Sequence, residues 1–304
     1  MIGYRNEHTI ASPCEVMGRG YWSGQAVQIR FQPAPGGTGI VFVRSDLSGN
    51  PQCPARVQYA NGIQFRTNLE NGDARFTMVE HVMAALAGLE VDNCYVEVDA
   101  EEMPGLDGSS QAYVVALQSA GLVIQSILKP QLIIEAPFKV RFEDATIEVT
   151  PSKGRVASFG YRLAYDSDSA IGDQDFLFEL NPRQFVRQVA SARTFVTLEQ
   201  AEQLRAAGIA GHVSNQELLV IGPEGPIENT YRFGNECARH KTLDMIGDLA
   251  LVGVDLIGQF RSDRGGHRIN GVLAQQLSEM LAQAKMAGDC RASKACDSRH
   301  GKVA

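Results

Sequence analysis

The sequence predicts an α+β protein made of two units of similar topology. Strand-length runs that are apolar or alternate in polarity are interspersed with segments whose apolar residues recur at helical spacing. Each half of the chain also contains a histidine-bearing helix, then a short strand, then a second helix. The histidines are His81 and His240, and the strands start after Asp92 and near Asp255. This coarse repeat indicates a duplicated unit with helices packed on sheets.

The first half is expected to contain both strands and helices. The runs "QAVQIRF" and "GIVFVRS" have strand patterns, and the turn-forming "QPAPGGT" separates them. A helix is expected to begin near Thr77 and to end at Gly88. The full set for this half is strands at 25–31, 39–45 and 92–99, and helices at 77–88 and 110–120.

A boundary between the two domains is predicted at "LKPQ", residues 128–131. Pro130 disfavours helix for the residue before it, and new strands are expected directly afterwards. The domains are therefore predicted as 1–127 and 128–288, followed by a mobile tail at 289–304, which is polar and has no periodicity. The second domain is expected to have strands at 131–135, 138–142, 145–149, 156–165 and 254–260, and helices at 199–207, 236–252 and 271–287.

The composition is that of an ordinary globular protein. A chain of 304 residues with 44% hydrophobic and 21% charged residues is able to bury a substantial core. Its net charge of −7 argues against a nucleic-acid-binding protein, which usually presents a basic face. We expect no nucleic-acid partner.

The cysteines and the apolar segments favour a cytoplasmic protein. The six cysteines have no spacing typical of a disulfide framework, so reduced thiols are expected. The start "MIGYRNEHTI" lacks the pattern of a signal peptide. No uninterrupted apolar stretch reaches the roughly 18 residues of a membrane span. We expect a monomer without a membrane span.

A stripe of ionisable residues marks the helix predicted at 236–252. His240, Asp244 and Asp248 are four residues apart, so they lie above one another on one face, with Lys241 at its edge. The rest of the helix is largely apolar, and ionisable groups in such surroundings need a partner or a metal. His240 and Asp244 are therefore candidate metal ligands. A simple helical ion pair between them is the alternative.

A third ligand is expected from the other half of the chain. Catalytic zinc sites commonly have three His and carboxylate ligands and one open position. His81 offers the third ligand, and the adjacent Glu80 is placed to accept a proton from metal-bound water. The alternative for Glu80 is structural, because Thr77 and Glu80 also form a capping-box pattern.

Two further residues have competing interpretations. His267 follows two glycines and is a candidate general acid with Asp248 as its carboxylate partner, although an exposed loop histidine is the simpler interpretation. Cys237 precedes His240 by three residues, a spacing found in structural zinc sites. No second pair of this kind accompanies it, so a structural zinc site is the less favoured interpretation.

Several motifs together resemble one family. "TMVEHVMAALAGLEVDN", "MPGLDGSSQAYV", "RQVASARTF", "RHKTLDMIGDLALVG" and "GGH" occur in this order over nearly the whole chain. They are similar to the zinc-dependent UDP-3-O-acyl-N-acetylglucosamine deacetylases of lipid A biosynthesis. The resemblance implies two α+β domains with the active site between them, one catalytic zinc ion, and a nucleotide-linked acylated amino sugar as substrate.

The resemblance also implies roles for individual residues. It makes His81, His240 and Asp244 the zinc ligands and Glu80 the general base. His267 would protonate the leaving amine, oriented by Asp248, and Thr194 would stabilise the oxyanion. Residues 195–221 match an insert that helps to form the passage for the acyl chain, and 106–110 match a segment near the domain junction. The structural alternative for that segment is that Asp107 or Ser109 only caps the following helix. The predicted substrate-binding residues are Lys241, Phe195, Trp22 and Arg264.

Two segments depart from the family pattern. In "GRGYWSG", residues 18–24, Trp22 replaces a histidine and is expected either to stack on a sugar or to fill the core. In "AGHVSNQ", residues 210–216, His212 and Val213 stand where glycines are usual. Two alternatives therefore stay open: a zinc amidohydrolase of the same fold acting on another acylated amino sugar or nucleotide sugar, and a non-catalytic binding relative.

Overall fold

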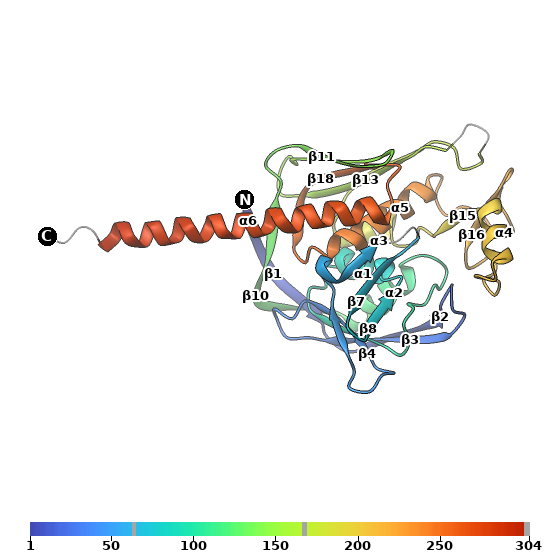
Figure 1. The fold of residues 1–304 in the computed structure, drawn as a ribbon, viewed down its shortest axis with the longest axis horizontal. Helices are drawn as coiled ribbons and strands as arrows, with labels where there is room; N and C mark the ends of the chain where they lie inside the picture. Colours follow the sequence, from blue (N-terminus) through green and yellow to red (C-terminus); the bar gives the residue numbers. More distant parts are fainter. Residues whose placement is uncertain (63–64, 166–168, 301–304) are drawn as a thin grey trace.

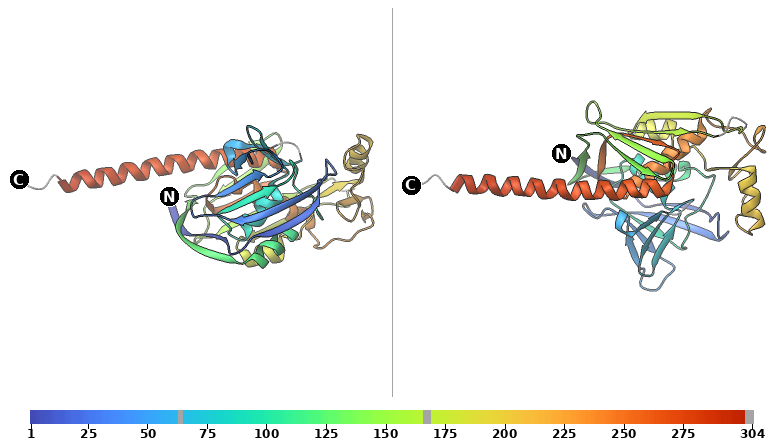
Figure 2. Two further views of the ribbon diagram at one scale, coloured as in Figure 1. Left: turned by 90° about the horizontal axis from the view of Figure 1, so that it is seen from below. Right: turned by 45° about the horizontal axis from the view of Figure 1, so that its top comes forward.

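A computed structural model describes residues 1–62, 65–165 and 169–300. It has the α+β architecture that the sequence predicts, with two main sheets on either side of a central pair of helices (Figure 1). The chain is apolar where these layers meet, so one continuous core runs through both halves. Figure 2 shows the same layers from two further directions.

The first main sheet has five strands in the order β2-β3-β9-β4-β5. Its central strands alternate apolar and polar residues, so one face is buried and the other reaches solvent. All neighbouring strands are antiparallel except β4 and β9, which are parallel. The strands are β2 (Cys14–Arg19), β3 (Ala26–Pro33), β4 (Ile40–Arg44), β5 (Gln52–Pro54) and β9 (Cys94–Val98).

The second main sheet has seven strands, and it contains both β1 and β18, the first and the last of the strands described. Its path is β1-β10-β18-β12-β11, and β13 joins β18 to β14. The central strand β18 is buried at Leu256 and Ile257 and then at alternate positions from Gly258 onward. The strands are β1 (Ile2–Ile10), β10 (Leu122–Ile133), β11 (Phe138–Phe142), β12 (Ala145–Thr150), β13 (Ala157–Leu163), β14 (Gln174–Glu179) and β18 (Asp255–Asp263).

Helices α1 (Glu80–Gly88) and α5 (Glu236–Ala250) pack against each other between the sheets. Both are buried almost all round, as expected of helices in the centre of a protein. The repeat predicted from the sequence is present: α1 is followed by β9 and α2 (Gln111–Ala120), and α5 is followed by β18 and α6 (His267–His300). A short helix, α3 (Pro182–Gln188), packs near α1.

Two small sheets flank this body. One is β6-β7-β8, with β6 (Ala60–Gly62), β7 (Thr67–Asn71) and β8 (Ala74–Thr77), and a 3-10 turn, η1 (Val57–Tyr59), precedes it. The other begins in the predicted insert, continues past its expected end at residue 221, and lies at one end of the molecule (Figure 1). This sheet comprises β15 (Phe195–Thr197), β16 (Leu219–Gly222) and β17 (Gly225–Pro226), and the helix α4 (Leu198–Ala206) lies beside it.

The structure corrects some expected boundaries. The helix expected from Thr77 begins at Glu80, because Thr77 ends β8 and Met78 turns the chain with a φ of 63°. Residues 128–131 lie inside β10 instead of between strands. Pro130 is accepted there because it pairs only with β1, and β18 joins β10 from Gln131 onward. The domain division itself stays a prediction.

The last helix is longer than expected. It begins at His267, four residues earlier than predicted, and continues to His300, away from the layers (Figure 1). It therefore covers most of the predicted tail, and residues 301–304 lie outside the described residues. None of the helices over the described residues combines the length and the apolar character needed to cross a membrane.

Candidate active site

One cavity collects most of the residues that the sequence singled out. It lies at the N-terminal end of α1 beside the first half of α5, and its open space is about 780 Å³. Its catalytic end is polar and the rest of its wall is mostly apolar. The candidate residues that line it are Trp22, Glu80, His81, Thr194, Phe195, His240, Lys241, Asp244 and His267.

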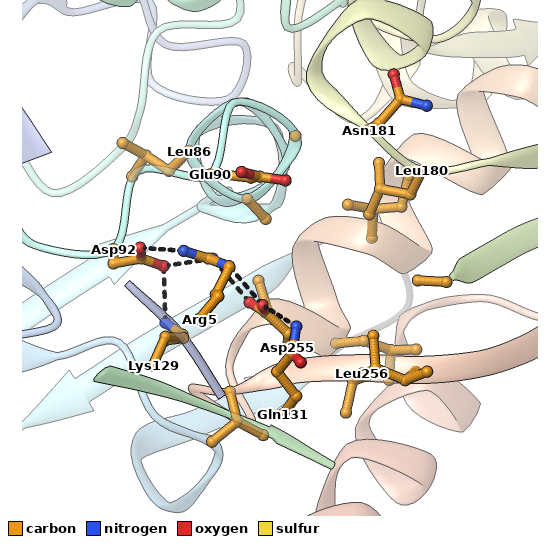
Figure 3. A pocket seen from close by; sticks show the side chains of 18 of the residues that line it. Arg5, Leu86, Glu90, Asp92, Lys129, Gln131, Leu180, Asn181, Asp255 and Leu256 are labelled. Carbon is orange, nitrogen blue, oxygen red and sulfur yellow. Dashed lines mark hydrogen bonds and ion pairs between the residues drawn. The ribbon is translucent and has the colours of Figure 1, made fainter. Parts of the chain in front are cut away.

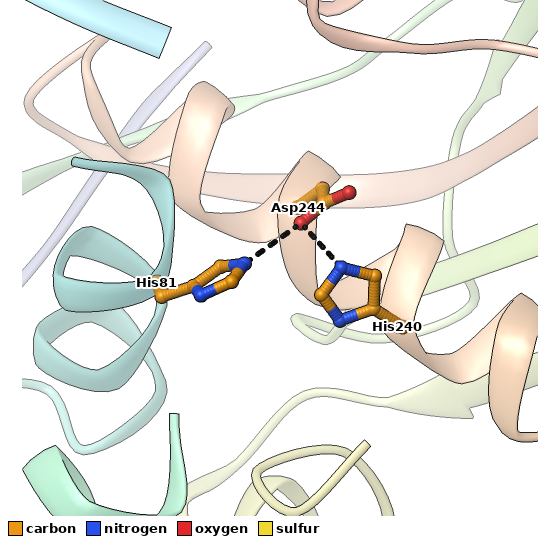
Figure 4. A group of neighbouring side chains, drawn as sticks. All are labelled: His81, His240 and Asp244. Carbon is orange, nitrogen blue, oxygen red and sulfur yellow. Dashed lines mark ion pairs between the residues drawn. The ribbon is translucent and has the colours of Figure 1, made fainter. Parts of the chain in front are cut away.

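His81 of α1 and His240 and Asp244 of α5 form the centre of the site (Figure 4). Their candidate ligand atoms all lie within 4.8 Å of one another. The Asp244 Oδ1 atom is 3.5 Å from His81 Nε2 and 3.3 Å from His240 Nε2, and all three side chains are buried. Packing of α1 against α5 thus brings together two histidines that are far apart in the sequence.

The polar atoms of this group fit a metal ion. Asp244 Oδ1 is buried and has no hydrogen-bond partner, which is costly unless something else binds it. His240 Nδ1 lies 3.1 Å from the Ala192 carbonyl, to which it donates, so the lone pair of Nε2 faces Asp244. Burial lowers the pKa of His240 to about 3, and the imidazole is therefore neutral, as a metal ligand must be. A neutral imidazole favours metal ligation over the simple ion pair with Asp244.

Glu80 is fully buried at the start of α1. Its Oε2 atom accepts a hydrogen bond of 3.0 Å from the Thr67 main-chain N–H on β7. The capping-box interpretation of Thr77 and Glu80 is wrong, because Val79 is the N-cap residue and no side chain caps this helix. Burial raises the pKa of Glu80, and the nearby His267 and His81 partly oppose this effect.

His267 is buried at the start of α6, so the interpretation as an exposed loop histidine is wrong. Its Nδ1 atom lies 2.9 Å from Asp248 Oδ2. Burial alone would lower the pKa of His267, but the Asp248 carboxylate outweighs it and raises the pKa to about 9. Asp248 also accepts hydrogen bonds from the Thr67 hydroxyl at 2.6 Å and from Asn270 Nδ2 at 2.8 Å.

Thr67 and Asn270 were missed at the sequence level. Thr67 contacts Glu80 through its main chain and Asp248 through its side chain, so it links the candidate base to the carboxylate partner of His267. No local pattern marks it, because it is placed by the pairing of β7 with β6 and by the Val79 N–H, which donates to its carbonyl at 3.1 Å. Asn270 stands one helical turn after His267 on α6, a spacing that could have indicated a shared face.

Lys241 and Thr194 border the group of three. Lys241 Nζ forms an ion pair of 2.8 Å with Asp244 Oδ2. Burial alone would lower the pKa of Lys241, but Asp244 outweighs it and raises this pKa. The Thr194 hydroxyl lies 3.1 Å from His240 Nε2 and donates to the Gly108 carbonyl. Each of these two side chains therefore contributes a polar group to the wall of the cavity.

The remaining wall is aromatic and aliphatic. Trp22 is half-buried, and the Arg66 guanidinium lies 4.7 Å from the centre of its ring. Trp22 thus forms part of the cavity wall instead of filling the core alone. The apolar lining residues beside it are Phe65, Met78, Phe195, Val196, Leu204, Val213 and Leu218.

Arg264 does not line this cavity. It is half-exposed and forms ion pairs of 3.3 Å with Asp144 and Asp263 at the surface, so its predicted substrate contact stays a prediction. The N-cap residue of α2 is Ser110 and not Asp107 or Ser109, although Ser109 Oγ accepts from the N–H of Gln111, the first residue of α2, at 3.2 Å. Cys237 is buried and lies outside the group of candidate ligands.

A second cavity lies at the opposite ends of α1 and α5 (Figure 3). Its polar side is an ion network in which Arg5 of β1 contacts Asp92 at 2.7 Å and Asp255 at 2.6 Å. Lys129 adds a further ion pair of 3.2 Å to Asp92. Asp92 and Asp255 occupy corresponding places after α1 and α5, so Arg5 ties the two halves of the repeat together. No sequence pattern marked Arg5 as part of this network.

Comparison with known proteins identifies the family. The family described as "LpxC: UDP-3-O-acyl N-acetylglycosamine deacetylase" matches residues 7–279, which include every residue of the cavity and all of both main sheets except the start of β1. The chain belongs to this deacetylase family. Its central group of two histidines and one aspartate is thus a candidate metal site in a family of metalloenzymes.

Curated relatives of the deacetylase family match most of the chain. A UDP-3-O-acyl-N-acetylglucosamine deacetylase of Anaeromyxobacter sp. (strain Fw109-5) is 37% identical over 280 residues, covering 90% of this chain and 89% of the relative. The protein of the same name from Psychrobacter arcticus is 36% identical over 276 residues, covering 90% and 85%. That from Nostoc sp. is 35% identical over 276 residues, covering 89% and 98%.

Proposed function

We propose that this protein hydrolyses the N-acetyl group of UDP-3-O-acyl-N-acetylglucosamine and releases acetate, as a zinc-dependent step of lipid A biosynthesis. The observation that carries the proposal is the buried group of His81, His240 and Asp244 beside Glu80 and His267 in one cavity. Two histidines and a carboxylate with room for water are ligands that suit catalytic zinc. When bound, zinc would lower the pKa of a water molecule and polarise the acetamide carbonyl.

Three side chains of this protein would carry the proton transfers and the charge. Glu80 accepts a proton from the water whose oxygen attacks the acetamide carbon. The Thr194 hydroxyl turns to donate a hydrogen bond to the carbonyl oxygen as it becomes negative. His267, protonated at neutral pH because its pKa is raised to about 9, gives a proton to the nitrogen as the C–N bond breaks. Acetate and the free amine are the products.

The other parts of the cavity suit the other parts of this substrate. The apolar wall formed by Phe195, Val196 and Leu204 has the character of a site for an acyl chain. Lys241 is a cation at the polar end, where it would face sugar or phosphate oxygens. Trp22 would contact the sugar ring. Arg264 lies on the surface, close to His267 in the sequence, and would reach the phosphates.

The test is release of acetate from UDP-3-O-acyl-N-acetylglucosamine by the purified protein, with metal analysis of the same sample. We expect about one zinc ion per chain, loss of turnover with a chelator, and recovery when zinc is added back. Zinc without acetate release from this substrate would favour another acylated amino sugar or nucleotide sugar. Absence of bound metal would favour the non-catalytic alternative and overturn the proposal.

We further propose that the enzyme acts as a monomer in the cytoplasm. Cys14, Cys53, Cys94 and Cys237 are free thiols, which suits a reducing compartment. Burial raises the pKa of Cys53 and of Cys94 to about 12, so both are protected from oxidation. Sedimentation at several concentrations tests the monomer, since a concentration-dependent mass would contradict it.

A further inference from the structure

The insert has few anchors to the body of the protein. Its strands form a separate small sheet at one end of the molecule, β15-β16-β17, with α4 beside it (Figures 1 and 2). At its start, the Thr194 main-chain N–H donates to the Gly108 carbonyl at 2.7 Å. Residues 210–218 are held by Asn229, whose Nδ2 atom donates to the Asn215 carbonyl at 2.8 Å, and by contacts with the loop at residues 20–24.

Two hydrogen bonds join that loop to the insert, and we call them the insert latch. The Tyr21 hydroxyl donates to the Glu217 carbonyl at 2.6 Å, and His212 Nε2 donates to the Gly20 carbonyl at 3.0 Å. The imidazole of His212 also packs on Gly24, where a Cβ atom would lie 3.0 Å from the ring. Because Gly24 also has a φ of 68°, glycine is the residue that best allows this contact.

The loop side of the latch is rigid. The Glu102 carboxylate accepts hydrogen bonds of 2.8 Å from the main-chain N–H groups of both Trp22 and Ser23. The Tyr21 ring is packed against Gly105, where a Cβ atom would stand 2.0 Å from the ring. Because the Tyr21 ring is held in this way, its hydroxyl fixes the position of the Glu217 carbonyl. The position of the loop therefore determines the position of the insert.

Both sides of the latch form the wall of the catalytic cavity. Tyr21 and Trp22 line it from the loop, and Val213 and Leu218 line it from the insert, next to His212 and Glu217. We infer that the insert latch sets the separation of these walls and thereby the length of acyl chain that the enzyme prefers. This inference rests on the proposed deacetylase function.

The experiment compares kcat/KM over a series of UDP-3-O-acyl-N-acetylglucosamines that differ only in acyl length. Wild type is expected to show a maximum at one length. In His212→Ala and in Tyr21→Phe, kcat/KM for the preferred chain divided by kcat/KM for a shorter chain should fall about three- to tenfold. This is the effect expected for the loss of one hydrogen bond. The loss should be in KM, while kcat and metal content stay unchanged. His212→Gln, which keeps an N–H donor, should restore part of the preference.

Arg205→Ala is the matched control, since Arg205 is exposed on α4 and bonds only to Asn215 within the insert. It should keep the wild-type length profile. Unchanged profiles in both latch variants, with wild type active, would overturn the inference. Wild type inactive on every member of the series would instead refute the proposed function. If His212→Ala does not fold, Tyr21→Phe decides the question because it retains the packed ring.

Discussion

Gly247 on α5 lies directly against the main-chain carbonyl of Glu80 on α1. A Cβ atom at Gly247 would stand 2.0 Å from that carbonyl oxygen, a distance that real structures do not allow. Three residues away on α5 is Asp244, and next to Glu80 on α1 is His81, so this contact sets the distance across which the candidate metal ligands face each other. The glycine is therefore needed for the site as well as for packing.

Gly247→Ala is expected to weaken metal binding and activity. The added methyl group must push α1 away from α5, at a cost of about 1–3 kcal/mol in the free energy of unfolding. We expect a clear drop in bound metal at limiting zinc, measured together with Tm. Gly271→Ala on α6 is the control, since a Cβ there meets no atom within 4 Å. Normal metal affinity in Gly247→Ala would show that the helix contact does not set the ligand spacing.

Glu80→Gln tests the proposed base. The amide keeps the size of the side chain and can still accept from the Thr67 N–H, so the fold and the metal should remain. It cannot accept a proton from water, and a loss of about a hundredfold to ten-thousandfold in kcat is expected. Acetate release and metal content measured on one preparation check this. Near-normal turnover would remove Glu80 from the role.

Thr67→Val tests the link between the candidate base and the carboxylate partner of His267. The substitution removes the hydroxyl that donates to Asp248 at 2.6 Å but leaves the main-chain N–H that holds Glu80. His267 then loses a fixed partner, and we expect kcat to fall about tenfold with little change in KM. Thr67→Ser retains the hydroxyl and should stay close to wild type. Equal kcat in the Val and Ser variants would contradict a positioning role.

Local patterns predicted the parts of the site that lie on one element. The four-residue spacing of His240 and Asp244 is visible in the sequence because a helix repeats within the same stretch of chain. The wrong capping-box prediction also came from a local pattern. Thr77 and Glu80 match the local motif, but the pairing of β8 places Thr77 in a strand, and tertiary contact prevails over the motif.

Contacts between distant segments were not predictable from residue patterns alone. Thr67 reaches Asp248 across 181 positions, and Tyr21 reaches Glu217 across 196. Such pairs depend on how whole sheets and helices pack, which no short motif encodes. His81 could be joined to His240 because a histidine beside a carboxylate suggests chemistry and because the family resemblance covers both. Arg5 had neither signal.

Asp92 provides a pH test of the network around Arg5. Burial alone would raise its pKa, but hydrogen bonds and ion pairs with Arg5 and Lys129 outweigh this and lower the pKa below the usual range. A carboxyl with a lowered pKa in the folded state stabilises the fold above its unfolded pKa of about 3.9, and this contribution disappears as the pH falls through the folded value. The stabilisation should therefore be present at neutral pH and lost in acid.

Asp92→Asn should lower the free energy of unfolding by about 2 kcal/mol at neutral pH, because Arg5 keeps Asp255 but loses one charged partner. The difference from wild type should shrink steadily below about pH 4. Urea unfolding of both proteins at a series of pH values measures it, with Asp73→Asn at an exposed site as control. A difference that stays constant down to strongly acidic pH would mean that Asp92 acts through shape alone. The charge of the carboxylate, shared by Arg5 and Lys129, would then contribute nothing to holding the two halves together.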